Sequence, residues 1–356
     1  MKILHLITSL AGGPSKIMSS IIRKKENKES HSILVLSDLN IDKEVYSQLI
    51  KNNIKINFVQ RRFLFDYKPY FKLLKLTENS TPDLILSYDN YSNFIGFLRV
   101  FKISKIKLIC SVHGLKGAFK WWKIPIQIII YKFAKFIIVP SKNVRKKILR
   151  HKIVNQNKIK VIHNGIDLNF LINNKKKIGN NLKIVCVANF YSKFKGQKYL
   201  IESLKYLPSK FSIYLIGDGI LIDDIKKISI ENNLDRRVKF LGFKNENFLK
   251  KNLCKFDLMV IPSLSESFCI AALEGMASGL PVIASDVGGL GEIFENRQNG
   301  ILVNPGKPDL IAKEVIKISN DFKKYQLIRK NALLTVKKKY SEKIMVKNYK
   351  YLFKML

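Results

Sequence analysis

Short apolar runs alternate with stretches of helical periodicity along the whole chain. The runs are rich in Ile, Leu and Val without strict polar alternation, a pattern typical of strands covered on both faces. They predict strands at 2–7, 32–36, 56–59, 84–87, 107–111, 136–139, 159–162, 183–187, 211–216, 238–241, 258–261, 281–284 and 300–303. Because helical stretches separate these strands, we expect an α/β fold with two doubly wound parallel sheets.

The strands divide into two series around a polar stretch. The chain has 356 residues, 47% of them hydrophobic, which favours two domains over one. The polar stretch 169–181 is the best linker candidate. We expect one Rossmann-like domain over 1–165 and a second over 166–340. Residues 341–356 alternate Lys with apolar side chains at helical spacing and predict a helix that packs back on the first domain.

The formal net charge of +37 is concentrated in the first half of the chain. No Asp or Glu occurs between Asn90 and Ile166, whereas seventeen Lys and Arg lie from Arg99 to Lys160. Such a field suits nucleic acid, an anionic membrane surface or an acidic substrate, or it reflects lysine-rich composition alone. Trp121 and Trp122 adjoin lysines, a composition that suits a membrane interface, although ordinary core packing is the alternative.

Neither a leader nor a membrane-spanning segment is expected. The opening MKILHLITSL is too short in its apolar part for a signal peptide and predicts the first strand. The apolar stretch 124–139 is interrupted by Lys132 and Lys135 and falls short of the ~20 residues that span a bilayer. The four cysteines form no CxxC pair, so we expect no disulfide framework, and a reduced cytoplasmic setting fits.

Two glutamates eight residues apart follow the strand predicted at 258–261. Glu266 is expected in the loop and Glu274 in the next helix, which Ser263, Ser265 and Ser267 are expected to cap. Fully helical spacing would separate the two glutamates by ~12 Å, too far for a close acid–base pair but suited to the two ends of one elongated ligand. The helix N-terminus offers N–H groups to a phosphate. Alternatively, Glu266 is a capping carboxylate and Glu274 faces solvent.

The segment 266–293, ESFCIAALEGMASGLPVIASDVGGLGEI, resembles the donor-site signature of a known family. It has the pattern of the retaining glycosyltransferases of family 4, in the GT-B superfamily and also called glycosyl transferases group 1. The resemblance implies two Rossmann-like domains facing a cleft, the first binding acceptor and the second binding a nucleotide sugar. It implies that Glu266 contacts the donor's sugar hydroxyls near the reacting face and that Glu274 binds the ribose. Donor contacts are further implied for Ser267, Phe268, Cys269 and Ile270.

Two more segments match the family in order and spacing. VIHNGID at 161–167 resembles the hinge before the second domain. VANFYSKFKG at 187–196 resembles the loop in which the family places an Arg and a Lys on the diphosphate. Lys195 matches the Lys, but Asn189 stands at the Arg position, a departure that Lys193 is a candidate to compensate.

Several glycines follow strands, where the backbone can approach a ligand closely. The donor-binding glycines implied by the resemblance are Gly12, Gly13, Gly217 and Gly242. His113 follows the strand 107–111 and matches the family's strand-end histidine, which faces the cleft near the transferred sugar; a structural role is the alternative. Lys16, in the first predicted helix, is a candidate to meet an acidic acceptor.

The resemblance implies transfer of a sugar from a UDP- or GDP-sugar to a hydroxyl of a glycan or lipid-linked acceptor. The family account is a front-face departure with retention, in which the leaving phosphate helps deprotonate the acceptor. The expected setting is bacterial envelope polysaccharide synthesis (lipopolysaccharide, capsule or O-antigen), in the cytoplasm with peripheral attachment to an anionic membrane surface. No metal and no cofactor are expected, because lysines and helix dipoles can neutralise the diphosphate.

Other functions remain open at this point. A GT-B-fold nucleotide-sugar epimerase would need acid and base residues, and a phosphorylase a cofactor lysine site, neither of which is found. A basic nucleic-acid-binding protein would fit the charge, but it would leave the paired glutamates unexplained and no recognised nucleic-acid motif is present. We therefore expect no nucleic-acid partner.

Overall fold

A computed structural model describes this chain as two compact units. The first unit comprises residues 1–164 and 343–356, and the second comprises residues 165–342. The boundaries predicted after 165 and after 340 differ from these by one and two residues. The residues that the structure describes are 1–37, 41–60, 66–103, 105–113, 124–151, 154–170 and 181–356. Most of the linker candidate, 171–180, therefore lies outside the described residues.

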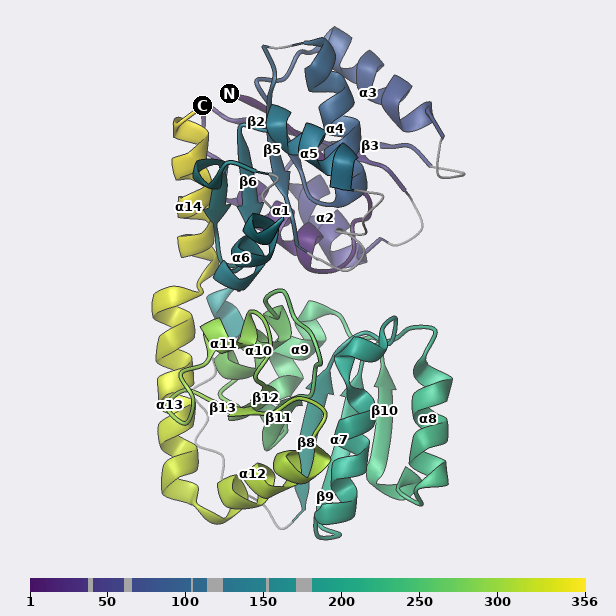
Figure 1. Ribbon diagram of the computed structural model, residues 1–356, viewed down its shortest axis with the longest axis vertical. Coiled ribbons are helices and arrows are strands. Elements are labelled where there is room, and N and C mark those ends of the chain that lie inside the picture. Colours follow the sequence, from purple (N-terminus) through teal and green to yellow (C-terminus); the bar gives the residue numbers. More distant parts are fainter. Residues whose placement is uncertain (38–40, 61–65, 104, 114–123, 152–153, 171–180) are drawn as a thin grey trace. The chain divides into compact units, whose positions relative to one another are not determined.

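The first unit is built on a seven-stranded parallel sheet in the order β3-β2-β1-β4-β5-β6-β7 (Figure 1). The chain therefore reverses direction across the sheet between β1 and β4, as in doubly wound folds. The strands are β1 (Lys2–Ile7), β2 (Ser30–Val35), β3 (Lys55–Phe58), β4 (Leu84–Ser87), β5 (Lys107–Ser111), β6 (Phe136–Val139) and β7 (Ile159–Val161).

Helices cover both faces of this sheet. The core on one face joins apolar side chains of α1, α2 and α14, and the core on the other joins those of α3, α4, α5 and α6. The helix α14 comes from the far end of the chain, and its side chains Met345, Tyr349 and Phe353 pack into the first core. The helices are α1 (Gly13–Arg23), α2 (Lys43–Lys51), α3 (Lys68–Asn79), α4 (Asn90–Lys102), α5 (Ile124–Phe133), α6 (Lys142–Arg150) and α14 (Glu342–Lys354).

The second unit repeats this plan with six parallel strands in the order β10-β9-β8-β11-β12-β13. Its strands are β8 (Leu182–Val187), β9 (Phe211–Ile216), β10 (Val238–Gly242), β11 (Leu258–Ile261), β12 (Val282–Ser285) and β13 (Ile301–Val303). Its helices are α7 (Gln197–Ser203), α8 (Ile222–Glu231), α9 (Glu246–Asn252), α10 (Ile270–Ala277), α11 (Leu290–Ile293), α12 (Pro308–Asn320) and α13 (Phe322–Lys339). Side chains from α7 and α12 fill the core on one face, and those from α9, α10 and α11 fill the core on the other.

The thirteen predicted strands are all present, with ends that differ by at most two residues. Side-chain oxygens fix several helix starts: Asp89 and Ser92 form a capping box at α4, and the Ser141 hydroxyl accepts from the Val144 amide at α6. Among the described residues, no helix is both long and apolar enough to cross a bilayer.

Candidate active site

Four loops meet at the carboxyl edge of the second unit's sheet, because β9, β8, β11 and β12 are neighbours in it. Backbone hydrogen bonds tie these loops together. The Leu264 amide donates to the Phe194 carbonyl at 2.7 Å, and the Gly289 amide donates to the Glu266 carbonyl at 3.1 Å. The loops after β8 and β12 are thus fixed on opposite sides of the loop after β11, which carries Glu266.

Two glycines make these close contacts sterically possible. Gly196 has φ +69°, and a Cβ there would lie 2.0 Å from the Pro262 carbonyl oxygen. Gly288 has φ +56°, and a Cβ there would lie 1.9 Å from the Glu266 carbonyl oxygen. Only glycine fits at either position, since other residues disfavour this conformation and would also collide with backbone. The glycine-rich frame noted in the sequence therefore holds the loop that carries Glu266.

Lys195 and Glu266 form an ion pair at the centre of this edge. The Lys195 Nζ lies 2.7 Å from Glu266 Oε1, and the Ser263 hydroxyl donates to the same oxygen at 2.9 Å. Burial alone would lower the pKa of Lys195, but the Glu266 carboxylate and its hydrogen bond raise that pKa above its ordinary value. The lysine side chain is 26% exposed and the glutamate 9%, so an incoming ligand can reach the lysine of this pair more readily than the carboxylate.

The helix that follows starts later than the sequence predicted. Cys269, with φ +108°, precedes Ile270 at the start of α10, and no side-chain oxygen caps this helix. The prediction that Ser263, Ser265 or Ser267 caps it is therefore wrong. The uncapped first turn leaves backbone N–H groups next to Glu266, where a phosphate could accept from them.

Glu274 lies inside α10 and is only 4% exposed, so the alternative that it faces solvent is wrong. It lies four residues after the first helical residue, Ile270, about one turn into the helix. The separation of ~12 Å expected from Glu266 assumed a helix over all eight steps. That assumption is wrong, because the first four steps are loop. Phe268 is buried beside this helix, while Ser267, Cys269 and Ile270 are half-buried.

The other predicted donor residues lie on neighbouring loops of the second unit. Asn189 and Lys193 are exposed after β8, and the Asn189 carbonyl accepts from the Gln197 side chain at 2.9 Å. Gly217 follows β9, and its amide donates to the Gly242 carbonyl at 3.0 Å. A Cβ on Gly242, at the end of β10, would meet no atom within 4 Å, so the backbone there borders open space.

In the first unit, His113 follows β5 at the carboxyl edge of the sheet. Both of its ring nitrogens are buried and have no hydrogen-bond partner among the described residues. Burial lowers the pKa of His113 to about 4, so the ring is neutral at physiological pH. Its ring stacks with that of Tyr88, with 6.4 Å between centroids. Gly114 and the tryptophans Trp121 and Trp122 lie outside the described residues.

The predicted first-loop residues lie at the start of α1. Gly12 is exposed with φ +84°, and Gly13 is the first residue of the helix. A Cβ on Gly12 would meet nothing within 4 Å. Lys16 is half-buried one turn into α1. These residues follow β1, an interior strand of the first unit's sheet between β2 and β4, at its carboxyl end.

A buried chain of aromatic groups behind His113 was not predicted from the sequence. His5 shares hydrogen bonds with the Tyr88 hydroxyl (2.9 Å) and with His31 (2.8 Å), and His31 approaches Glu29 at 3.4 Å. Burial first, and then the charge of His31, lowers the pKa of His5 well below its ordinary value. The available signal was a single histidine within the apolar run KILHLI, because a polar side chain in a buried strand needs a partner.

Comparison with known proteins gives consistent results for both halves of the chain. A family model described as Glycosyl transferases group 1 matches residues 169–334, and one described as Glycosyltransferase Family 4 matches residues 30–170. An uncharacterized glycosyltransferase of Methanocaldococcus jannaschii, MJ1607, is 35% identical over 218 residues, which are 58% of this chain and 56% of that protein. This chain therefore aligns with little more than half of that relative's length.

One relative with a named reaction and one solved structure are also similar. The Escherichia coli UDP-Gal:alpha-D-GlcNAc-diphosphoundecaprenol alpha-1,3-galactosyltransferase is 27% identical, with 72% of this chain and 71% of that protein aligned. The crystal structure of Anabaena Alr3699/HepE in complex with UDP-glucose has a TM-score of 0.88 at 22% identity and covers both chains completely. At this identity, the structural likeness shows the fold.

Proposed function

This chain belongs to the group 1 glycosyl transferases of family 4 and has their GT-B fold, and from this we propose that it transfers a sugar from a UDP-sugar to an acceptor hydroxyl with retention of configuration. The ion pair of Lys195 and Glu266 carries this proposal. A nucleotide sugar needs a cation at its diphosphate and a hydrogen-bond acceptor at its sugar, and here the two lie 2.7 Å apart. UDP is preferred to GDP because the Escherichia coli relative and the Anabaena structure both carry UDP in their names.

Each donor residue takes one part of this ligand. Lys195 stabilises the negative charge that develops on the leaving diphosphate, together with the uncapped first turn of α10. Glu266 accepts hydrogen bonds from the sugar hydroxyls, and Glu274 accepts them from the ribose. Peptide groups at Gly217 and Gly242 border the nucleotide. The backbone is open at Gly242, whereas a Cβ on Gly217 would lie 2.0 Å from the Ala188 carbonyl oxygen. Side chains that would line the donor are Ser267, Phe268, Cys269 and Ile270.

The proposed reaction needs no protein nucleophile. The bond between the anomeric carbon and the diphosphate oxygen breaks, and the acceptor oxygen forms its bond to the same face of that carbon. The acceptor's proton passes to the departing diphosphate, so the products are the glycoside and UDP. Lys195 lowers the energy of this step because it is charged before the reaction and its partner Glu266 holds it in place. We propose that no metal is required.

The first unit supplies the acceptor side in this proposal. His113 is neutral at physiological pH, so it can donate or accept one hydrogen bond near the transferred sugar without adding charge. Gly12 and Gly13 allow the first loop to approach the donor phosphate and the acceptor. Lys16 is a candidate for an acidic acceptor group.

The proposed acceptor is a lipid-linked glycan of bacterial envelope polysaccharide synthesis. The Escherichia coli relative is named for a sugar on diphosphoundecaprenol, which is such an acceptor. A cytoplasmic site is proposed because the cysteines Cys110, Cys186, Cys254 and Cys269 are all unpaired thiols.

A transfer assay tests the reaction. The protein is incubated with individual UDP-sugars and with lipid diphosphate-linked or simple glycoside acceptors, and NMR spectroscopy determines the configuration of the new linkage. We expect an α-linked product from an α-linked donor, at a rate that a metal chelator leaves unchanged. An inverted product would contradict retention, and loss of activity on chelation would contradict independence of metal.

A further inference from the structure

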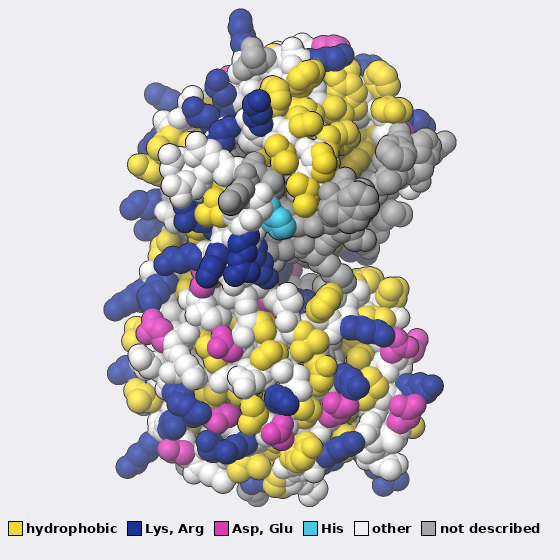
Figure 2. Space-filling view, viewed as in Figure 1, with side chains coloured by type: hydrophobic (Ala, Val, Ile, Leu, Met, Phe, Trp, Pro, Cys, Tyr) yellow, Lys and Arg dark blue, Asp and Glu magenta, His cyan; other side chains and the backbone are white. Residues whose placement is uncertain are grey.

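One face of the first unit exposes a patch of large apolar side chains. They lie on α5 and at the end of α4, both of which pack on the same face of the sheet. The exposed fractions are 64% for Phe101, 43% for Ile129 and 40% for Phe133, with Ile126 and Ile128 at 37% and 38%. Figure 2 shows hydrophobic side chains gathered on this unit over α4 and α5. Clustered exposed apolar side chains of this size mark an interaction surface.

The rim of this apolar patch is basic. Lys102 and Lys105 follow Phe101, and Lys132 and Lys135 flank Phe133; all four are exposed. The whole stretch from Asn90 to Ile166 contains no Asp or Glu, so no carboxylate of these elements offsets the charge. An apolar centre with a lysine rim is the composition of helices that lie in a membrane interface.

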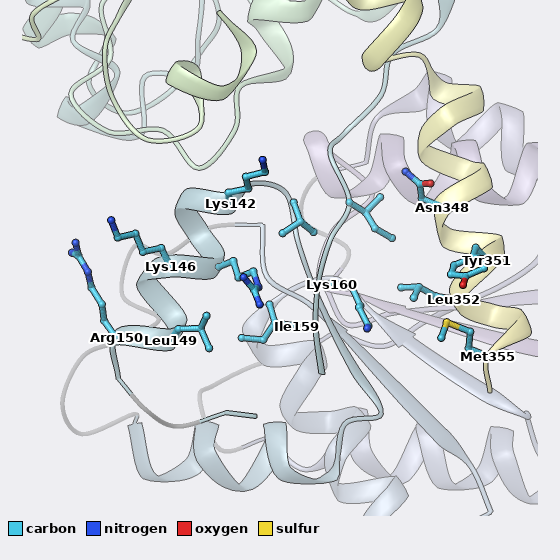
Figure 3. A pocket seen from close by; sticks show the side chains of 13 residues that line it. Lys142, Lys146, Leu149, Arg150, Ile159, Lys160, Asn348, Tyr351, Leu352 and Met355 are labelled. Carbon is cyan, nitrogen blue, oxygen red and sulfur yellow. The ribbon is translucent and has the colours of Figure 1, made fainter. Parts of the chain in front are cut away.

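A basic groove lies on the same unit, along the free edge of its sheet. The strand β7 is the edge strand, with α6 packed on one face and α14 on the other. The groove holds about 1070 Å³ between these elements. Figure 3 shows Lys142, Lys146 and Arg150 on the α6 side, Lys160 between, and Tyr351 and Met355 on the α14 side.

The groove combines cations with apolar side chains. Arg145, Lys146 and Arg150 of α6 line it together with Lys160 of β7, and no Asp or Glu lines it. In the part of the chain that the structure describes, no carboxylate forms an ion pair with Arg145, Lys146 or Arg150. Tyr351 and Met355 of α14 remain 65% and 47% exposed at its other side. A phosphate group next to a hydrocarbon chain could bind the cations and also contact the apolar side chains of α14. A soluble anion would bind the cations only.

We propose that this unit binds an anionic membrane surface through α4, α5 and α6. The apolar patch enters the boundary between headgroups and acyl chains, and the groove holds the phosphate of an anionic phospholipid. The lysine rim and the cations of α6 select for anionic lipid, since each such cation near the surface adds to the attraction. This surface is separate from the donor site on the second unit, so the proposal does not rest on the transfer chemistry.

Vesicle co-sedimentation of the full chain tests this proposal. Vesicles of phosphatidylcholine alone are compared with vesicles that also contain phosphatidylglycerol, at low and moderate salt. We expect sedimentation only with phosphatidylglycerol, and we expect part of it to persist at moderate salt because the apolar contact is not screened. No sedimentation, or equal sedimentation with both kinds of vesicle, would overturn the proposal.

Two double variants separate the apolar and the charged contributions. F101S with I129S should weaken binding at least tenfold, and K146Q with R150Q should weaken it about thirtyfold, or about fivefold for each cation. All four side chains are exposed, so the fold should persist. Matched controls lie on α2, on the opposite face of the sheet: Y46S with I50S, and K43Q with K51Q. If the α2 controls weaken vesicle binding as much as the variants on α4, α5 and α6 do, this surface is not the membrane contact. The same conclusion follows if the variants on α4, α5 and α6 leave binding unchanged.

Two competition experiments test whether the groove binds a phospholipid or another phosphate-containing ligand. Inorganic phosphate and a short DNA duplex are added at the phosphate concentration of the vesicles, and neither should release the protein. Release by inorganic phosphate would indicate a soluble anion site, and release by DNA would indicate nucleic-acid binding; either result would overturn the proposal. The shift of the unfolding temperature by UDP should be equal in all these variants, which keeps this test distinct from a test of the donor site.

Discussion

Lys195 and Glu266 share one hydrogen-bonded site, so a change in either alters the surroundings of the other. The sequence assigned them separately, one to the diphosphate and one to the sugar. In the structure they contact each other, and Ser263 holds the shared oxygen. In this account the carboxylate keeps the lysine charged and oriented until a diphosphate arrives.

The two side chains should therefore be energetically coupled. In a double-mutant cycle with K195M and E266Q, we expect a coupling of about 1–2 kcal/mol in the free energy of unfolding, because each single change leaves a partly buried partner unpaired. Urea unfolding of the four proteins measures it. Lys226 and Asp223 of α8 are a matched control, since they are 3.0 Å apart but exposed, and their coupling should stay near 0.3–0.5 kcal/mol. Additive effects at Lys195 and Glu266 would contradict the shared site.

The buried histidines of the first unit should make its stability depend on pH. Burial lowers the pKa of His113 from 6.5 to about 4, and the pKa of His5 shifts in the same direction. Above pH 6.5 the ring is neutral in both the folded and the unfolded chain. As the pH falls below 6.5, the unfolded chain takes up a proton that the folded chain does not, so stability is lost until the pH reaches about 4.

Urea unfolding at about pH 7.5 and about pH 5 should show this loss. We expect His113 alone to lower the free energy of unfolding by about 2 kcal/mol at the lower pH. H113N should lose less stability than the parent between the two pH values, because the asparagine does not titrate. A parent protein equally stable at both pH values would be inconsistent with buried neutral histidines.

Backbone contacts between neighbouring loops fix the positions of the loops at the carboxyl edge of the second unit's sheet. Gly196 and Gly288 allow neighbouring loops to approach closer than any side chain would permit. Because the loop after β12 contacts the Glu266 carbonyl, its position helps to set that of Glu266. The donor site is therefore a property of several strand ends together.

G288A should disturb this arrangement. Its Cβ would lie 1.9 Å from the Glu266 carbonyl oxygen, so one of the two loops must move. We expect a loss of about 1–3 kcal/mol in the free energy of unfolding and a clear rise in the KM for the donor. Gly306 has a similar φ of +71° but no contact closer than 3.7 Å, so G306A should leave the donor KM unchanged. If G288A and G306A changed the donor KM equally, the cause would be the positive φ that the two positions share, and the contact with Glu266 would have no part in it.

Strands were easier to predict than helix starts, for a physical reason. A strand buried on both faces carries an uninterrupted apolar run, so β1, β4 and β9 have the bounds that their sequences indicate. The start of α10 carries no such signal. Three serines suggested a cap, but Cys269 takes the left-handed conformation before the helix begins, and Ser263 instead bonds Glu266. Tertiary contacts decided this boundary, and they also moved Glu274 into the protein interior.

Each of the two units repeats one topology. If the strands of each are numbered along the chain, both sheets have the order 3-2-1-4-5-6, with a seventh strand added to the first. The first unit is completed by α14, from the far end of the chain, whose apolar face fills the core beside β1. The amphipathic pattern of 341–356 made this helix predictable. The hydrogen-bonded chain from Glu29 to Tyr88 was not predictable, because its members lie in or next to β1, β2 and β4, which are far apart in the sequence.

In the proposed donor site, the second unit binds a nucleoside diphosphate through the loops around Glu266 and Glu274. Isothermal titration of UDP into the parent protein, E274Q and the exposed control E231Q measures this binding. We predict that UDP binds the parent and E231Q equally and binds E274Q about tenfold more weakly, because a hydrogen bond to a charged group is lost. No binding of UDP to the parent, or equal binding to E274Q, would contradict the account.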